Sequence, residues 1–493
     1  MTIERIIEVI KKNHPAADTA LLELAYEFAE KAHQNQKRLT GEPYIEHSLE
    51  TTYKLAQMNL DMPTIIAGVL HDVPEETDMD QEEIEKNFGE EIAFLVHGIT
   101  KLGTIKYRGL ERYAENLRKM FVAMAEDVRV IFIKFADRIH NLKTLYAQPP
   151  VKQQRIARET LEIYAPIANR LGMEELKSEL EDLSFPYVYP EEYKWIKQLT
   201  QKKYEQRKRY TDKVIKKLDK ELRQNSTINL IRIEGRAKHH YSLYLKLLKK
   251  DRDIDRVYDL IAMRIIVNNV EDCYHTLGHI HKLWKPVRGR IKDYISQPKP
   301  NGYRSLHTSV YCEEGRIAEF QIRTFKMHRE AEYGIAAHWQ YKDVDNKKNK
   351  RKVAVPQEKI EWIKDLLEKQ QQLTTTKRYL NSLKLDFFKN RIFVFTPKGD
   401  VIDLPEGATP IDFAYHIHTE IGHKCTGAKV NEKMVNLTTA LKNGDMVEIL
   451  TDKHRQGPSE NWLQFTQTHL ARAKIKDYYN KQKKLNIFKL FNR

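Results

Sequence analysis

The sequence changes its pattern near residue 200, and this change constrains the fold more than any other feature. Residues 1 to about 195 repeat apolar side chains at three- and four-residue spacing, as in TIERIIEVIKK and KQQRIARETLEIYAPIANRL. This is the period of the helix. Beyond a charged helix at about 200–225, β-rich runs such as DLIAMRIIV and IAEFQIRT are separated by turn residues. The sequence therefore predicts a multidomain chain with an all-α region followed by an α/β or α+β region.

Further divisions follow from composition. The segment DVDNKKNKRKVAVP is basic and polar and predicts a linker, which a helical stretch follows. Short strands with Gly and Pro turns then predict a small β domain. The predicted parts are an all-α domain at 1–195, an α/β domain at 196–345, a basic linker and helix at 346–388, a small β domain at 389–452 and a helical tail at 453–493.

Charge and composition narrow the class of protein. The 84 Lys and Arg against 69 acidic residues give a net charge of +15, which favours polyanionic partners such as nucleotides or RNA. The sequence has no apolar run long enough for a membrane span and no signal-peptide pattern at its start. Three widely separated cysteines argue against a zinc ribbon or a disulfide framework. These features predict a cytoplasmic location without a membrane partner, and they do not predict an oligomeric state.

Polar residues inside apolar helices mark a first candidate site. GEPYIEHSLE, VLHDVPEET and VIFIKFADRIHNLKTL supply His47, His71, Asp72 and Asp137. Two imidazoles and two carboxylates suit a divalent ion of the manganese, iron or zinc type with open positions for water. Such an ion lowers the pKa of its water. Glu75 and Glu76, about one turn on, could orient that water or accept its proton.

A structural role is the alternative at each of these positions. A single His in a helix is more often structural than a ligand. Asp137 follows an apolar run, where an unpaired carboxylate is costly, so it needs Arg138, a metal or another partner. Spacing alone leaves both interpretations open. Pro74 cannot continue a regular helix at low cost, so we expect the helix to end just after His71 and Asp72.

A second candidate site is spread over the α/β region. Nucleotidyl chemistry needs cations for a triphosphate, carboxylates for Mg²⁺ and an oriented acceptor hydroxyl, and an aromatic face can stack on a purine. Separately, each residue could be a solvated or turn residue, but their order along the chain favours a nucleotide site. The set comprises Arg236, Lys238, Ser242, Lys246, Asp259, Arg264, Lys292, Lys299, Asn301, Tyr303, His307, Glu319 and Gln321.

The first site resembles the HD phosphohydrolases. GEPYIEH, HDVPEET and FADRIHNLKTL look like the hydrolase domain of the RelA/SpoT homologues, the long enzymes that make and degrade guanosine tetra- and pentaphosphate. The resemblance implies Mn²⁺ at His47, His71, Asp72 and Asp137, and release of the 3′-pyrophosphate from the alarmone. It also implies a nucleotide contact at Arg38. The sequence departs from the family at Glu76, where Asp is usual, and at Pro74, where an aliphatic residue is usual.

The second site resembles the synthetase domain of the same family, which has a nucleotidyltransferase-like fold. The implied reaction moves pyrophosphate from ATP to the 3′-hydroxyl of GDP or GTP. By position, Asp259 and Glu319 would bind Mg²⁺, with Glu319 also the candidate base. Arg236, Lys238 and Lys246 would take the ATP phosphates, and Tyr303 would stack on the guanine. The basic loop RIKD at 290–293 resembles that of bifunctional members, whereas synthetase-only members carry an acidic version.

The C-terminal part resembles the β-grasp-like TGS domain of these enzymes and the start of the helical region that follows it. The resemblance implies binding of uncharged tRNA on the ribosome, with His418 and His423 as the RNA contacts. The cysteine-bearing segment and ACT-type domain of the family have no counterpart here. Three interpretations compete: a bifunctional alarmone enzyme, a synthetase whose HD domain is a metal-binding relic, and a non-catalytic ribosome- or tRNA-binding module. The intact phosphate-handling residues and the basic loop favour the first.

Overall fold

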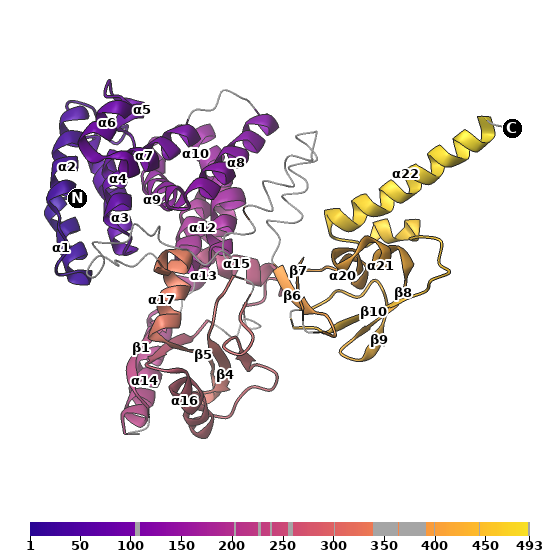
Figure 1. The fold of residues 1–493 in the computed structure, drawn as a ribbon. Coiled ribbons are helices and arrows are strands. Elements are labelled where there is room, and N and C mark those ends of the chain that lie inside the picture. The colour runs from indigo at the N-terminus through magenta and orange to yellow at the C-terminus, as the bar shows by residue number, and fades with distance from the viewer. Residues whose placement is uncertain are drawn as a thin grey trace. The chain divides into compact units, whose positions relative to one another are not determined.

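The structure is a computed structural model that describes residues 1–103, 109–201, 204–224, 228–236, 239–254, 260–299, 301–338, 363, 391–398, 400–442 and 444–491. The chain divides into two compact units, Met1–Gln372 and Leu373–Arg493. Figure 1 shows helices and a sheet in the first unit, and strands with short helices and the helix α22 in the second. Lys238, Asp259 and nearly all of the predicted linker at 346–388 lie outside the described residues.

The N-terminal part of the first unit is helical, as predicted. Its elements are α1 (Ile3–Asn13), α2 (Ala20–Ala32), α3 (Ile45–Gln57), α4 (Met62–Leu70), α5 (Val73–Glu76), α6 (Gln81–Phe88), α7 (Glu90–Gly103), α8 (Gly109–Glu126), α9 (Arg129–Lys143), η1 (Leu145–Ala147), α10 (Pro150–Glu159), the π-helical η2 (Thr160–Tyr164), α11 (Ala165–Arg170), α12 (Glu174–Val188), α13 (Pro190–Gln201) and α14 (Tyr204–Arg223).

Three of these helices form the centre of the helical part. Every residue of α4 from Thr64 to Leu70 is buried, and α9 buries ten of its side chains. Both helices contact α3. Gly68 permits the close approach of α4 to α3, because a Cβ atom there would lie 2.4 Å from Cδ1 of Leu55. This packed centre holds the residues of the first candidate site.

A five-stranded sheet follows in the order β1-β2-β5-β4-β3. Strands β2 and β5 are parallel and the other pairs are antiparallel. The elements are β1 (Leu230–Arg236), α15 (His240–Leu248), β2 (Ala262–Val267), α16 (Val270–Leu283), β3 (Lys292–Asp293), β4 (Leu306–Tyr311), η3 (Glu313–Gly315), β5 (Ile317–Thr324), α17 (Phe325–Tyr333) and η4 (Gly334–His338).

The two faces of this sheet differ. Apolar residues of β2, β4 and β5 pack against α14 and α16 in one core, which includes Ile265, Phe320 and Val214. Side chains alternate between faces along a strand, so Arg264, Glu319 and Gln321 lie on the opposite face. One face of the sheet therefore forms part of the core, and the other face carries these polar side chains.

Helix α12 connects the helical part with the sheet part. It contacts α9, α10 and α11 on one side and α15 and α17 on the other. The predicted division after residue 195 falls inside α13, and it stays a prediction.

The second unit contains a small β domain. Its elements are β6 (Arg391–Phe395), β7 (Val401–Pro405), α20 (Pro410–Ile417), α21 (Thr419–Lys424), β8 (Cys425–Val430), β9 (Lys433–Val435), β10 (Val447–Thr451), η6 (Glu460–Gln464) and α22 (His469–Phe491). A parallel bridge from Phe395 to Met446 joins the β6–β7 pair to the β10-β8-β9 sheet.

One buried carboxylate links the β domain to the tail helix. Asp412 in the first turn of α20 accepts hydrogen bonds from Thr409, from the backbone amides of Gln467 and Thr468, and from the Thr468 hydroxyl. Asp412 is fully buried. The predicted fold class, an all-α part, an α/β part, a β-grasp-like part and a helical tail, is confirmed.

Candidate active sites

The first candidate site is a buried group of metal-ligand side chains from three places in the helical part. His47 lies on α3, His71 directly follows α4, and Asp137 lies on α9. They are 1%, 0% and 4% exposed, and their ligand atoms all lie within 4.8 Å of one another. Nε2 of His47 lies 3.3 Å from Oδ2 of Asp72 and 3.4 Å from Oδ1 of Asp137, and Nε2 of His71 lies 3.2 Å from Oδ1 of Asp72.

The hydrogen bonds of the two imidazoles determine which nitrogen is available. Nδ1 of His71 donates to the carbonyl oxygen of Gly68 at 2.9 Å, while its buried Nε2 makes no hydrogen bond to any residue that the structure describes. Nδ1 of His47 lies 2.7 Å from Nδ1 of His140, which also lies 3.2 Å from the Arg38 guanidinium. Because a guanidinium only donates, Nδ1 of His140 accepts, and His47 donates to it. In both histidines, Nε2 is therefore the nitrogen that can ligate a metal.

Residues that the sequence analysis did not single out hold the carboxylates. The Tyr44 hydroxyl donates to Oδ2 of Asp72 at 2.8 Å. The Lys134 ammonium lies 2.8 Å from Oδ2 of Asp137, and the Asn141 amide donates to Oδ1 of the same carboxylate. Lys134 and Asn141 lie one turn before and after Asp137 on α9, so helical spacing from Asp137 is the signal that could have identified them.

Three of the four candidate ligands have pKa shifts that suit a metal site. Burial lowers the pKa of His71, which keeps its ring neutral. Burial alone would raise the pKa of Asp137, but the Lys134 charge and the His47 hydrogen bond hold it well below its ordinary value. Burial also opposes ionisation of Asp72, yet the two histidines lower its pKa. Burial would lower the pKa of His47, but its hydrogen bonds to Asp137 and Asp72 raise it. Because neutral imidazoles and ionised carboxylates are the forms that ligate a divalent cation, a bound metal would displace the proton of His47.

The distances also fit a cation. Two atoms that each bond one ion at about 2.1 Å lie roughly 3.0–3.4 Å apart in octahedral or tetrahedral geometry. The three separations that join His47, His71 and the two carboxylates fall in or next to this range. His47, His71 and Asp137 can therefore hold a divalent metal, and one oxygen of Asp72 lies next to each histidine.

The expectation about Pro74 is wrong. Helix α4 ends at Leu70, before the ligands, and Pro74 lies in the first turn of the short helix α5. A proline costs little there because the first amides of a helix have no intrahelical partner. Glu75 and Glu76 lie at the end of α5 with exposed side chains. Partial burial raises the pKa of Glu75 to about 7, the charge of Lys134 opposes this, and neighbouring carboxylates add to it.

Arg38 lies beside this group, and its predicted nucleotide contact stays a prediction. Its guanidinium donates to Oδ1 of Asn141 at 2.6 Å and lies over the Tyr44 ring at 5.8 Å. A fixed positive charge next to the metal-ligand group suits a phosphate.

The second candidate site lies on the polar face of the sheet. The Glu319 carboxylate accepts a hydrogen bond from the Gln321 amide at 2.9 Å and lies 3.4 Å from Nδ1 of His307. Burial would raise the pKa of Glu319, but His307, Gln321 and the charge of Lys246 lower it to about 2. Arg264 is opposite Gln321 in the strand register, and Lys292 is opposite His307.

The predicted guanine-stacking residue is already in contact with its neighbours. Tyr303 is 6% exposed, and its hydroxyl lies 2.9 Å from Nε2 of His307. The Lys299 ammonium lies 4.6 Å from the centre of the Tyr303 ring. Oδ1 of Asn301 accepts from the Tyr303 amide at 3.2 Å. The stacking role of Tyr303 stays a prediction.

The predicted phosphate ligands enter from two other elements. Arg236 ends β1, and Ser242 and Lys246 lie one turn apart on α15. Burial would raise the pKa of Glu174 on α12, but the charges of Lys299 and Arg236 lower it. Direct contacts thus join Lys299, Tyr303, His307, Glu319 and Gln321. The predicted basic phosphate ligands Arg236 and Lys246 lie around them.

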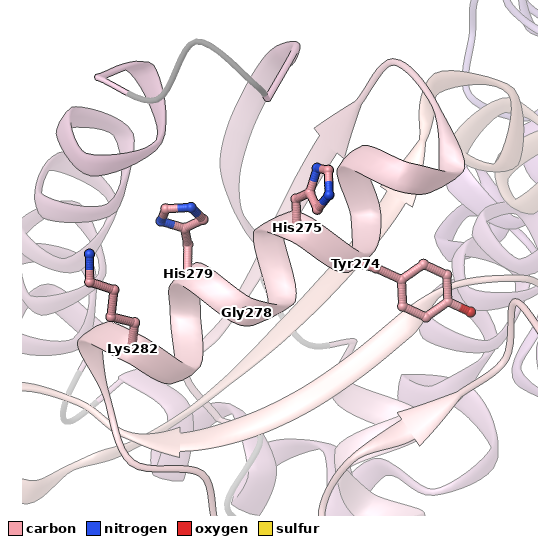
Figure 2. Close-up of a pocket in the computed structure, with 5 residues that line it drawn as sticks. All are labelled: Tyr274, His275, Gly278, His279 and Lys282. Atoms are coloured by element: carbon pink, nitrogen blue, oxygen red, sulfur yellow. The ribbon is translucent and has the colours of Figure 1, made fainter.

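A separate surface pocket of about 290 Å³ lies on α16. Tyr274, His275, Gly278, His279 and Lys282 line it, and Figure 2 shows His275 and His279 on the same side of the helix. Helix α16 covers the apolar face of the sheet, so this pocket lies away from Glu319. None of the predicted site residues lines it.

The two predicted RNA contacts in the second unit differ in their surroundings. Nδ1 of His418 accepts a hydrogen bond from the Glu420 amide at the start of α21, and its side chain is exposed. Nδ1 of His423 lies 2.9 Å from the Tyr415 hydroxyl, and its ring packs against Tyr478.

Comparison with known families gives three matches along the chain. A model described as HD domain matches residues 25–174, one described as Region found in RelA / SpoT proteins matches residues 235–346, and one described as TGS domain matches residues 392–451. The first and third matched ranges fall inside one predicted domain each, and the second extends one residue past the predicted end of the α/β domain at 345. The predicted boundaries stay predictions.

Three curated relatives match nearly the whole chain. The guanosine-3′,5′-bis(diphosphate) 3′-pyrophosphohydrolase of Aquifex aeolicus is 46% identical over 98% of this chain and 68% of its own length. The GTP pyrophosphokinase of Streptomyces coelicolor is 44% identical over 98% of this chain and 58% of its own. The bifunctional (p)ppGpp synthase/hydrolase RelA of Mycobacterium tuberculosis is 44% identical over 98% and 65%. The chain thus spans between 58% and 68% of the length of these three relatives.

Proposed function

The chain belongs to the RelA/SpoT family, and on this premise we propose that it is a bifunctional alarmone enzyme. Its synthetase part would transfer pyrophosphate from ATP to the 3′-hydroxyl of GDP or GTP, and its HD part would hydrolyse (p)ppGpp to GDP or GTP and pyrophosphate. The observation that carries the proposal is the buried His47–His71–Asp137 group beside an intact Asp72. A protein with synthetase activity alone would not need this metal-ligand group.

The hydrolytic role is argued from the residues around this group. We propose Mn²⁺ as its ion, which when bound would lower the pKa of a water molecule and so supply the nucleophile. Tyr44, Lys134 and Asn141 hold the two ligand carboxylates in place. Glu75, with its pKa near 7, suits proton transfer at neutral pH. Arg38 would hold a phosphate of the alarmone.

The transfer role rests on the polar face of the sheet. Asp259 and Glu319 would hold Mg²⁺, which would neutralise charge on the triphosphate. A carboxylate with a pKa of about 2 is a weak base, so the surroundings of Glu319 support a metal-binding role better than proton abstraction. Arg236, Lys238, Ser242 and Lys246 would bind ATP, and Arg264, Lys292 and Gln321 would complete the nucleotide pocket.

A direct assay separates the proposal from its alternative. Purified protein with labelled ATP, GDP and Mg²⁺ should yield ppGpp, and protein with ppGpp and Mn²⁺ should release pyrophosphate. Chelation of the metal before the second assay should abolish hydrolysis. Synthesis without hydrolysis at full Mn²⁺ occupancy would favour a synthetase with a relic HD domain, and Glu76 is the departure that would explain it.

Ribosomes and uncharged tRNA are proposed partners of the second unit, and a cytoplasmic location is proposed for the whole. The net charge of +15 and the TGS match support an RNA partner. None of the helices that the structure describes is both long and apolar enough to cross a membrane. Because His423 is engaged with Tyr415 and Tyr478, exposed His418 is the better candidate for an RNA contact. Stimulation of synthesis by ribosomes with uncharged tRNA, compared between wild type and His418→Ala, would test this.

A further inference from the structure

We propose that Asp182 is a positioning residue for pyrophosphate transfer, because it fixes the N-terminus of the helix that carries two of the proposed ATP ligands. Asp182 lies on α12, outside the matched synthetase segment at 235–346. The inference rests on the proposed function for the meaning of its kinetic effect, although the contact itself does not depend on that function.

Asp182 makes three hydrogen bonds at the start of α15. Its Oδ1 accepts from the Tyr241 amide at 2.9 Å, and its Oδ2 accepts from the His240 amide at 3.3 Å. Oδ2 also lies 3.0 Å from Nδ1 of His239. This contact raises the pKa of His239, although burial opposes the shift, so the imidazole tends toward its charged form next to the carboxylate.

Helix α15 supplies no cap of its own. His239 occupies the N-cap position and its side chain makes no capping hydrogen bond. The first amides of a helix have no partner within it, and an acidic side chain at that end also interacts favourably with the helix dipole. Asp182 therefore acts as an N-cap supplied by a residue 57 positions earlier in the chain.

The position of α15 matters for the proposed reaction. Ser242 and Lys246 project from it, and the charge of Lys246 contributes to the low pKa of Glu319. Because the Asp182 carboxylate occupies the N-terminus of α15, we expect the triphosphate to be bound by side chains of this helix rather than by its first amides. A small displacement of α15 would then move Ser242 and Lys246 away from the phosphates.

The rest of the interface would keep the fold intact without Asp182. Phe185 on α12 lies 5.3 Å from the Tyr241 ring and 5.2 Å from the Tyr244 ring, measured between centroids. Leu243 and Leu247 belong to the same apolar cluster. Loss of the carboxylate should therefore loosen the first turn of α15 and leave the packed side of the helix in place.

The test measures ATP binding and turnover in the full chain. For Asp182→Ala we expect KM for ATP and Kd for a non-hydrolysable ATP analogue to rise about tenfold, which corresponds to about 1.4 kcal/mol and lies in the range of lost helix caps. We expect kcat to change much less, since the lost contact acts on ground-state binding. Hydrogen exchange should become faster at the first amides of α15, which a change elsewhere would not produce.

Two further variants separate capping from other roles. Asp182→Asn keeps an oxygen that can accept from a backbone amide, so it should restore most of the affinity. Glu175→Gln is the matched control, because Glu175 is also an acid of α12 and lies 3.8 Å from Nε2 of His239. It should leave KM within about twofold of wild type, as an exposed pair is worth little.

The outcomes distinguish this inference from the proposed function. Wild-type KM and exchange rates in Asp182→Ala, in a protein that synthesises ppGpp, would overturn the capping role. An equal effect of Glu175→Gln would replace it with a general charge effect. If wild type makes no product from ATP and GDP, the proposed function fails, and the exchange rates of α15 in Asp182→Ala still decide whether Asp182 caps the helix.

Discussion

The two candidate sites of the first unit are built in different ways. The metal-ligand group uses side chains from packed helices, and Nε2 of His71 is held without a hydrogen bond to any described residue. On the sheet face, Glu319 and Tyr303 already bond to His307 and Gln321, and Lys299 lies over Tyr303. The first site thus leaves a buried imidazole nitrogen available for a metal, whereas in the second the predicted nucleotide-binding side chains already contact one another.

Removal of His71 should have the largest effect and act on one site only. His71→Ala takes away a fully buried ligand, so bound Mn²⁺ and hydrolysis should be lost together, while synthesis should be retained. Metal content and the two activities would be measured side by side. His97→Ala, at an exposed His of α7, is the control that should change neither. Hydrolysis that persists in His71→Ala would show that the ion is held elsewhere.

Removal of Glu319 should produce the opposite pattern. We expect Glu319→Ala to lower synthesis by at least about a hundredfold, because it removes a proposed Mg²⁺ ligand and such an ion contributes several kcal/mol of transition-state stabilisation. Mn²⁺-dependent hydrolysis should be unchanged. Glu271→Ala, at an exposed acid of α16, serves as the control. A parallel loss of hydrolysis in folded Glu319→Ala protein would mean that the two sites are not independent.

The pH dependence of hydrolysis should reveal Glu75. A carboxylate accepts a proton only when ionised, and burial raises the pKa of Glu75 to about 7. The rate should therefore rise as the pH increases through about 7. In Glu75→Gln this rise should disappear and the rate above pH 7 should fall by about a hundredfold. The same pH profile in wild type and Glu75→Gln would assign the titration to another group.

A smaller effect is expected from Lys134, which forms an ion pair with the carboxylate of Asp137. Lys134→Met should weaken Mn²⁺ binding by about tenfold, the lower end of the range for groups that hold a metal ligand. Mn²⁺ titration would measure it. Lys143→Met, at a half-exposed residue on the same helix that pairs with Glu179, should leave Mn²⁺ affinity unchanged. Equal affinities in wild type and Lys134→Met would show that Asn141 alone suffices to orient Asp137.

The sequence allowed a prediction of the fold and of the residues at the centre of each site. His47 and Asp137 were recognisable because polar side chains interrupt apolar helical patterns. The contacts that orient them were harder to see. His140 and Tyr44 act through residues far away in the chain, and nothing in local spacing indicates that His140 accepts a hydrogen bond from His47.

Two other features depend on tertiary structure in the same way. Helix α4 ends at Leu70, where the Gly68 carbonyl bonds to the His71 ring, so Pro74 begins a helix instead of ending one. The contact of Asp182 with His239 joins parts of the chain that the sequence placed in separate domains. Hydrophobic periodicity predicts which face of a helix is buried, but it does not predict which element covers that face.

The bonding of Asp412 has a consequence for anyone who divides this protein into fragments. A cut after residue 452, where the predicted β domain ends, would remove Gln467 and Thr468 and leave Thr409 as the remaining donor among those described. A buried carboxyl group that loses most of its hydrogen-bond partners destabilises its surroundings. The smallest fragment expected to fold as the parent does would therefore extend past the first turn of α22. The TGS match ends at residue 451, before these donors, so we expect residues 392–451 alone to be less stable than the same residues in the whole chain.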